Sequence, residues 1–327
     1  MSLLEIDDLS IEFGSPASPL VAVQRVSLSI AEGEVVGLVG ESGSGKSLTC
    51  RAIMRLVAHP GRITGGDIRF DGRAVLDMSN QELRRFRRND VGMVVQDPSS
   101  SLNPVFRIGN QMSTTLRTNL GLDRSAARSV AIEMLDGVGI PRADHVYRSY
   151  PHELSGGMRQ RVMIALATAG QPRLLLADEP TTALDVLTQK QILLLLADMR
   201  RERNMAMLLV SHDFGVIAQM CDRVAVMYGG RIVETGAVAD IYDDPHHPYT
   251  RSLLRSVPTL ERTDRADRRD LFDGKPPEIG PVRHACVFVD RCPHARAECS
   301  TRSMELVSFG EGRQSACPFE TTIASTA

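Results

Sequence analysis

Eight residues near the N-terminus have the types and spacing of a phosphate-binding loop. The stretch Gly40-Glu41-Ser42-Gly43-Ser44-Gly45-Lys46-Ser47 spells G-x-x-x-x-G-K-S and follows an apolar run at 35–39. Its glycines let the backbone curl so that successive N–H groups point at phosphate oxygens. Lys46 adds a positive charge, and the Ser47 hydroxyl can ligate Mg²⁺. The stretch therefore predicts a site for a nucleoside triphosphate and magnesium.

Further candidates stand at the ends of three other apolar runs: Gln96, the pair Asp178-Glu179, and His212, which follows Ser211. Parallel α/β sheets place ligand contacts just past the carboxyl ends of their strands. Gln96 is therefore a candidate ligand contact, Asp178 suits a direct or water-mediated Mg²⁺ contact, and Glu179 can polarise an attacking water. His212 can donate to a phosphate oxygen. A lone histidine is more often structural, but this one repeats the placement of the others.

A second candidate anion site lies at Leu154-Ser155-Gly156-Gly157-Met158. Ser155 is the expected N-cap of a helix that runs to about residue 169. Two glycines leave the first N–H groups of that helix uncovered, as an anion-binding helix start requires. A capped helix alone would also explain the pattern, and the phosphate-binding loop elsewhere in the chain favours the anion site.

These residues need an α/β framework to position them. The run 35–39 predicts a buried strand, and Ser47 to Leu56 predicts the helix that follows the loop. Period-two alternation between residues 4 and 30 predicts a small antiparallel β-subdomain. Within it, Phe13 is a candidate to stack on a purine ring, with core packing as the alternative. Residues 97–170 are expected to form a helical subdomain, and a long helix is expected at about 186–204.

Composition bounds the class of protein. The chain has 327 residues, 43% of them hydrophobic, which suits one large α/β domain and a smaller appendage. A net charge of −2 gives no electrostatic case for nucleic acid or an anionic membrane, and the basic run 84–88 is interpreted as a solvated helix face. The sequence shows no apolar run of membrane-spanning length and no N-terminal signal pattern, so we expect a cytosolic chain.

Four of the six cysteines fall in one short C-terminal stretch: Cys286, Cys292, Cys299 and Cys317. In a reducing compartment such a group indicates metal before disulfide. The spacing lacks the close C-x₂-C pair of most zinc modules, which favours an iron–sulfur cluster and leaves zinc open. Cys50 and Cys221 are expected in the core. Because polar residues at 261–269 precede the rigid stretch 275–278, we place a boundary near residue 260.

The chain resembles ATP-binding-cassette ATPases from Leu3 to about Gly236. The motifs that carry this resemblance stand in the family's order: Gly40 to Ser47, Gln96, Leu154 to Met158, Asp178-Glu179, Ala183-Leu184-Asp185 and His212. It is similar more narrowly to the oligopeptide and dipeptide importers, a branch that includes nickel, opine and glutathione systems. The narrower match rests on GESGSGKS at 40–47, QDP at 96–98, YPHELSGGMRQR at 150–161 and PHHPYTRSLL at 245–254.

The resemblance implies a P-loop NTPase fold with a RecA-like core, an antiparallel β-subdomain and a helical subdomain. It divides the chain into an ATPase domain at 1–260 and a C-terminal domain at 261–327. It implies a 4Fe-4S cluster on the four tail cysteines, with zinc as the runner-up. The tail lies beyond the last cassette motif, so we expect it to be remote from the phosphate-binding loop.

In this family the loop of one subunit and the S-G-G segment of a partner enclose one ATP in a head-to-tail dimer. The resemblance implies that Ser155 with Gly157 binds the γ-phosphate across that interface, and that Glu179 is the general base. His212 would steady the γ-phosphate, Gln96 would sense Mg²⁺ and the membrane partner, and Asp185 would connect the two sites. The implied partners are a related second ATPase, two permeases and, indirectly, a solute-binding protein at the inner membrane.

Two departures from the family pattern touch this assignment. Leu187 stands where the family often has threonine, and the loop after Phe13 blurs its match to the adenine-stacking aromatic. A soluble cassette protein of translation or repair would show tandem cassettes or a long coiled-coil insertion, and the sequence has neither. The tail from Pro245 onward is also unlike that of an exporter.

Overall fold

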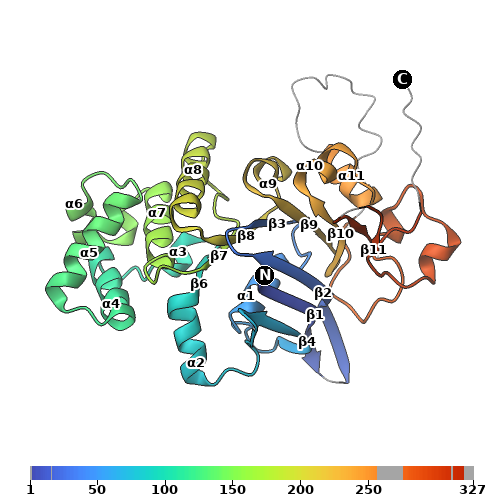
Figure 1. Cartoon of the computed structure of the whole chain (residues 1–327), viewed down its shortest axis with the longest axis horizontal. Coiled ribbons are helices and arrows are strands. Elements are labelled where there is room, and N and C mark those ends of the chain that lie inside the picture. Colours follow the sequence, from blue (N-terminus) through green and yellow to red (C-terminus); the bar gives the residue numbers. More distant parts are fainter. Residues whose placement is uncertain (1, 16, 256–274, 311, 320–327) are drawn as a thin grey trace. The chain divides into compact units, whose positions relative to one another are not determined.

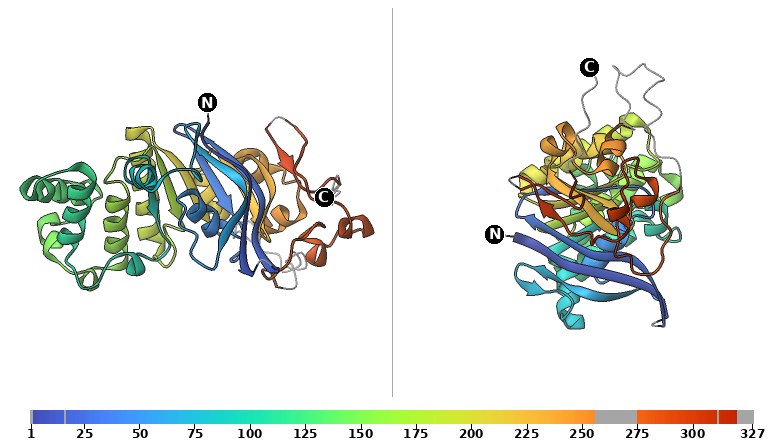
Figure 2. Two further views of the ribbon diagram at one scale, coloured as in Figure 1. Left: turned by 90° about the horizontal axis from the view of Figure 1, so that it is seen from below. Right: turned by 90° about the vertical axis from the view of Figure 1, so that its right-hand side faces the viewer.

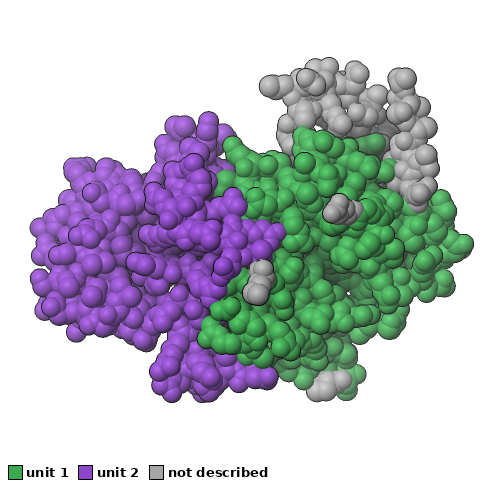
Figure 3. All heavy atoms as spheres, in the orientation of Figure 1, with its two compact units in different colours: residues 1–30, 35–76, 209–327 green, residues 31–34, 77–208 purple. Residues whose placement is uncertain are grey.

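The computed structural model describes residues 2–15, 17–255, 275–310 and 312–319. The chain divides into two compact units, coloured separately in Figure 3. Unit 1 comprises Met1–Ile30, Val35–Leu76 and Leu209–Ala327, and unit 2 comprises Ala31–Glu34 and Asp77–Leu208. The expected boundary near residue 260 lies outside the described residues.

Unit 1 begins with an antiparallel sheet in the order β2-β1-β4-β5. Its strands are β1 (Ser2–Ser15), β2 (Ser18–Ala31), β4 (Arg62–Phe70) and β5 (Arg73–Ala74). Strands β1 and β2 are the two long blue arrows that run side by side in Figure 2. Apolar residues of β1 are buried and pair with apolar residues of β4, as Leu4 does with Phe70 and Ile6 with Ile68. The period-two pattern thus forms the predicted β-subdomain.

A second sheet in unit 1 has the order β11-β12-β10-β9-β3. Strand β3 (Val35–Val39) is buried at every residue, which explains its unbroken apolar run. It pairs in parallel with β9 (Arg223–Tyr228), and β9 pairs antiparallel with β10 (Arg231–Ala237). The short tail strands β11 (Val307–Ser308) and β12 (Gln314–Ser315) extend this sheet through an antiparallel pairing of β12 with β10.

Four α-helices lie in the described part of unit 1, and Figure 1 shows their place along the chain. They are α1 (Lys46–Ile53), α9 (Phe214–Met220), α10 (Val238–Asp243) and α11 (Pro248–Arg255). Helix α1 ends three residues before the predicted Leu56, because the chain turns at the C-cap Met54. Cys50 on α1 is fully buried as predicted, whereas Cys221 at the end of α9 is only half-buried, which corrects its assignment to the core.

Unit 2 holds the parallel pair β6 (Val91–Val94) and β7 (Leu174–Asp178) and most of the helices. Strand β8 (Ala206–Ser211) leads from unit 2 into unit 1. The helices of unit 2 are α2 (Asn80–Arg85), a π-helical turn (Phe86–Asp90), α3 (Pro98–Ser101), α4 (Ile108–Leu120), α5 (Arg124–Gly137), α6 (Ala143–Arg148), a 3₁₀ turn (Pro151–Glu153), α7 (Gly156–Ala167) and α8 (Val186–Arg203). Residues 97–170 are mostly helical, as predicted.

Two helix starts follow local sequence rules. Ser79 and Glu82 form a reciprocal capping box at α2, in which the Glu82 N–H donates to Ser79 Oγ and the Ser79 N–H donates to Glu82. Ser155 caps α7 by accepting from the Met158 N–H at 3.3 Å. Across the part of the chain that the structure describes, no helix is both long and apolar enough to span a membrane.

Candidate nucleotide-binding site

The G-x-x-x-x-G-K-S loop joins β3 to α1 within unit 1, as the sequence predicts. Gly45 has φ of 105°, and a Cβ there would lie 2.7 Å from Met227 Cε and 3.0 Å from the Ala22 carbonyl. Both the backbone angle and the close approach therefore require glycine. The turn places the N-terminus of α1 at the loop, where the helix dipole favours an anion.

Lys46 is folded against the loop that it follows. Its Nζ donates to the carbonyl oxygens of Gly40 at 2.7 Å and Glu41 at 2.8 Å, and the side chain is 5% exposed. Ser44 Oγ lies 3.4 Å from the same nitrogen. The ammonium group is thus held at the mouth of the loop, where a phosphate oxygen would meet it.

A polar group of unit 2 gathers around Glu179, the residue directly after β7. Gln96 Nε2 donates to Glu179 Oε2 at 2.9 Å, and Thr182 Oγ1 donates to the same oxygen at 2.8 Å. Glu179 has φ of 48°, a left-handed conformation that costs a non-glycine residue of the order of 1–3 kcal/mol. Asp178 beside it is 2% exposed. The structure therefore brings together three of the predicted residues and adds Thr182.

The S-G-G helix start lies against the start of α8 in the same unit. A Cβ on Gly157 would lie 2.6 Å from Thr188 Cγ2, so glycine permits this contact. Asp185 caps α8 by accepting from the Thr188 N–H at 2.9 Å, and this hydrogen bond lowers the pKa of Asp185. Ser155 and Gly156 are exposed, which leaves this helix start open to a second molecule.

The remaining predicted residues, Phe13 and His212, belong to unit 1. His212 is exposed directly after β8, at the carboxyl end of a fully buried strand, as predicted. Phe13 is half-buried on β1, and a Cβ on Gly61 would lie 2.9 Å from its ring. This contact supports packing, and adenine stacking by Phe13 stays a prediction.

Two residues far along the chain, Tyr249 and Arg291, contact the phosphate-binding loop, and the sequence motifs did not predict either contact. The Glu41 N–H donates to Tyr249 Oη at 2.9 Å, and the Glu41 carboxylate forms an ion pair with Arg291. The expectation of a remote tail is therefore wrong, because contacts more than 200 residues apart in sequence join these groups. The signal in the sequence was the P-H-H-P-Y stretch at 245–249, which indicates the family but not a contact with the loop.

That stretch forms a buried polar cluster with Glu234 of β10. Glu234 accepts from the N–H groups of His246 at 2.6 Å and His247 at 2.9 Å, while burial raises the pKa of its carboxyl. Burial also lowers the pKa of His247 to about 3, so its ring is neutral and Nδ1 accepts from the Tyr249 N–H. The cluster fixes the turn that delivers the Tyr249 hydroxyl to the loop.

The four tail cysteines are half-buried and close enough to affect one another. Burial raises the pKa of Cys286 to about 11, with smaller contributions in the same direction from the thiols of Cys299, Cys292 and Cys317. The Cys286 N–H donates to the Cys299 carbonyl at 3.0 Å. Among the residues that the structure describes, however, no group of three or more His, Cys, Asp or Glu is placed to hold a metal ion. Four cysteines are suitable ligands for a thiolate-bound metal, but in the described structure they are not arranged around a common metal position.

The fold and these sites define the class of ATP-binding cassettes. A solved dimeric cassette, MJ0796 bound to ADP and Pi, superposes with a TM-score of 0.65 at 28% identity, covering 72% of this chain and 98% of that one. A model of the ABC transporter family matches residues 23–182, and one of the oligopeptide/dipeptide transporter C-terminal region matches residues 233–299. The chain is thus a cassette ATPase.

Curated relatives narrow the class to one branch. The oligopeptide transport ATP-binding protein OppD of Salmonella typhimurium is 44% identical over 96% of this chain and 93% of its own length. The dipeptide transport ATP-binding protein DppD of Escherichia coli is 43% identical over 98% of this chain and 97% of its own. The chain belongs to the ATP-binding subunits of the oligopeptide/dipeptide transporter family.

Proposed function

We propose that this chain binds and hydrolyses ATP to power a bacterial importer of dipeptides, oligopeptides or a related small solute. The observation that carries the proposal is the near full-length similarity, tail included, to relatives named for oligopeptide and dipeptide transport. Nickel, opines and glutathione are the alternative solutes of the same branch. The chain itself does not touch the solute.

The proposed reaction assigns one role to each group. Gly40 to Ser47 bind the triphosphate, with Lys46 on phosphate oxygens and Mg²⁺ held through Ser47, Gln96 and Asp178. Glu179 accepts the proton of the attacking water, and His212 steadies the γ-phosphate. The hydrogen bonds from Gln96 and Thr182 to one carboxylate oxygen support this role, because they fix where the carboxylate points.

Hydrolysis by this chain requires a second cassette in a head-to-tail dimer, a related subunit in our proposal. Ser155, Gly156 and Gly157 of one subunit then contact the ATP held by the other, and Asp185 connects the two sites. Exposed apolar side chains at the start of α8 support a partner there, because Val186 is 85% and Leu187 68% exposed.

The remaining partners follow from the importer assignment. Two membrane permeases transmit the closing and opening of the cassette dimer, and a solute-binding protein outside the membrane delivers the cargo to them. The chain acts as a peripheral subunit at the cytoplasmic face of the inner membrane and takes no nucleic-acid partner. The near balance of its charges supports the last point.

We further propose a 4Fe-4S cluster on Cys286, Cys292, Cys299 and Cys317, with zinc as the alternative. Four thiols within one tail and their mutual electrostatic influence support it. In the positions that the structure describes, the four thiols do not form a metal-holding group, so the proposal rests on their residue type and on their gathering in one tail. Such a group would supply a cross-link of the tail, and no step of ATP hydrolysis passes through it.

An uptake assay tests the importer assignment. Cells that lack this chain should lose uptake of a labelled dipeptide or tripeptide, and the wild-type gene should restore it. A Lys46→Ala variant, expressed at the same level, should not restore uptake, because the loop loses its charge. Unchanged peptide uptake with loss of nickel, opine or glutathione uptake would reassign the solute. Unchanged uptake of all four would contradict the proposal.

A further inference from the structure

We infer that Arg291, in the C-terminal tail, is a positioning residue for the phosphate-binding loop and sets the affinity of this chain for ATP. It acts through Glu41, the second residue of the loop. This inference concerns nucleotide binding by the chain itself, so it holds whichever solute is imported.

Arg291 and Glu41 form a bidentate ion pair, in which each guanidinium Nη atom contacts one carboxylate oxygen. Arg291 Nη1 lies 2.9 Å from Glu41 Oε2, and Nη2 lies 3.2 Å from Oε1. Nη1 also donates to the Tyr228 hydroxyl at 3.0 Å. The two side chains are 10% and 27% exposed, so solvent screens this pair far less than a surface pair. Two parallel charge-assisted hydrogen bonds fix direction as well as distance.

Glu41 passes this constraint to the groups that meet phosphate. Its N–H is held by the Tyr249 hydroxyl at 2.9 Å, and its carbonyl oxygen accepts from Lys46 Nζ at 2.8 Å. The Ser44 N–H also donates to the Glu41 carbonyl, at 3.2 Å. The side chain, N–H and carbonyl of one residue are thus tied to the tail, to α11 and to the phosphate-binding lysine.

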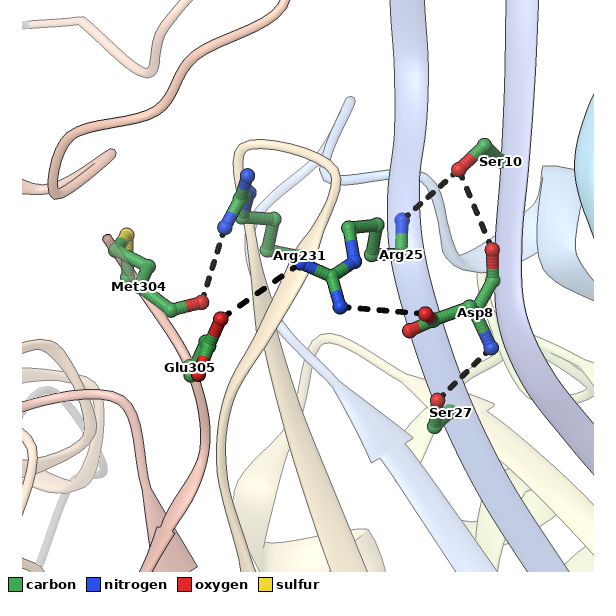
Figure 4. A network of polar contacts seen from close by, with 7 residues as sticks. All are labelled: Asp8, Ser10, Arg25, Ser27, Arg231, Met304 and Glu305. Carbon is green, nitrogen blue, oxygen red and sulfur yellow. Dashed lines mark hydrogen bonds and ion pairs between the residues drawn. The ribbon is translucent and has the colours of Figure 1, made fainter.

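Arg291 has a firm support, because the tail is fastened to the cassette on both sides of it. The Val21 N–H donates to the Gly280 carbonyl at 2.7 Å, and Gln24 bonds both the N–H and the carbonyl of Arg283. Buried Arg231 donates to the carbonyls of Arg283 and Met304 at 2.8 and 3.0 Å, and Figure 4 shows the second of these bonds.

An aromatic contact completes the support. The Phe288 ring packs edge-on against Tyr228, with 5.2 Å between ring centroids, and lies 5.5 Å from Tyr249. Phe288 is buried and stands three residues before Arg291. The same short segment therefore packs against both tyrosines that hold the loop, so the position of the tail and that of Glu41 are set together.

The test is ATP titration of the isolated full-length subunit. Replacing Arg291 by Met removes the bidentate ion pair with Glu41, so the loop samples other conformations. The Kd for ATP should therefore rise about tenfold, which is within the usual range of coupling between two sites. In the assembled complex KM should rise similarly while kcat stays within about twofold, because Arg291 does not touch the reacting atoms. An Arg291→Lys variant keeps the positive charge but cannot form the bidentate pair, so it should lose less affinity for ATP than Arg291→Met.

Glu305→Gln is the matched control. It removes another ion pair between tail and cassette, Arg25 with Glu305 at 3.9 Å, whose partners are 54% and 69% exposed (Figure 4). Such an exposed pair contributes little to stability. The control should bind ATP like the wild type. A Glu305→Gln variant that loses as much affinity as Arg291→Met would make the effect one of general tail loosening and overturn the inference.

A double-mutant cycle decides whether Arg291 acts through Glu41. Glu41→Gln should also weaken ATP binding, and the double variant should be no weaker than the weaker single one, because both changes break one contact. Additive losses would overturn the inference, as would an unchanged Kd in Arg291→Met. If Arg291→Met does not fold, the Arg291→Lys and Glu41→Gln pair carries the same cycle.

Discussion

Glu179 shows how one residue can be fixed by its backbone and its neighbours together. Its left-handed φ and two hydrogen bonds to one oxygen restrict the carboxylate to a narrow range of directions. The role of Glu179 as a candidate was predictable, because a carboxylate pair ends an apolar strand. Thr182 was not, since nothing in its type or spacing distinguishes it. Arg291 was still less visible, since it meets Glu41 across 250 positions.

Two substitutions separate contacts within one subunit from contacts across the dimer. Lys46→Ala should weaken ATP binding to the isolated subunit, because the ammonium group lies at its own loop. Ser155→Arg should leave that binding intact and block dimer closure, because Ser155 is exposed at a helix start. Equilibrium titration with ATP measures binding to the isolated subunit, and the molecular mass in solution with ATP shows whether the dimer forms. Equal losses of affinity in the two variants would contradict the assignment of Ser155 to the partner's ATP.

At the scale of elements, the most regular patterns were the most predictable. Strand β3 is an unbroken apolar run and β7 is apolar up to its last residue, Asp178, while the caps of α2 and α7 follow from a serine at the right place. The π-helical turn at Phe86–Asp90 was hidden, because tertiary packing decides such a turn. The tail strands β11 and β12 have two residues each, too few to show any alternation.

The turn before α11 should make the protein sensitive to acid. Because burial lowers the pKa of His247 to about 3, the unfolded chain binds a proton there that the folded chain does not, between about pH 6.5 and pH 3. The contribution of neutral His247 to the free energy of unfolding is therefore fully present above about pH 6.5 and is lost as the pH falls below it. At pH 5.5 the loss should be about 1.4 kcal/mol.

A His247→Gln variant tests this dependence, since the amide oxygen can still accept from the Tyr249 N–H. Denaturant unfolding at pH 7.5 and pH 5.5 should show that the wild type loses about 1.4 kcal/mol more than the variant. Glu234 is present in both proteins, so its own titration largely cancels in the difference. Equal losses would mean that His247 is protonated in the folded chain.

For the whole molecule, the sequence correctly indicated a cassette, and the expectation that its cysteine-rich tail is remote from the phosphate-binding loop was wrong. Motifs are local, so they locate the phosphate-binding loop and the tail without showing that the tail meets the loop. That contact depends on the pairing of β12 with β10 and on the buried side chain of Arg231, both long-range features. The tail is therefore a part of the nucleotide-binding unit, within unit 1.

The cysteines provide a test at this scale. Protein purified without oxygen should be brown, because thiolate-to-iron charge transfer absorbs visible light, whereas Zn²⁺ is d¹⁰ and colourless. Cys292→Ser should remove the colour. Since Arg291 is its neighbour in sequence, this variant should also weaken ATP binding. A colourless preparation with about one zinc per chain would contradict the cluster and support a zinc site. A preparation without metal would contradict both and mean that the four cysteines are ordinary thiols.

Phosphate release by the assembled transporter, compared between the wild type and Glu179→Gln, tests the central claim most directly. The amide keeps the shape of the side chain but cannot accept the proton of the attacking water. Turnover should fall at least 100-fold while ATP still binds with wild-type affinity, since general-base roles usually carry factors of this size. A variant that keeps more than about a tenth of the wild-type rate would contradict the assignment of Glu179 as the base of a cassette ATPase.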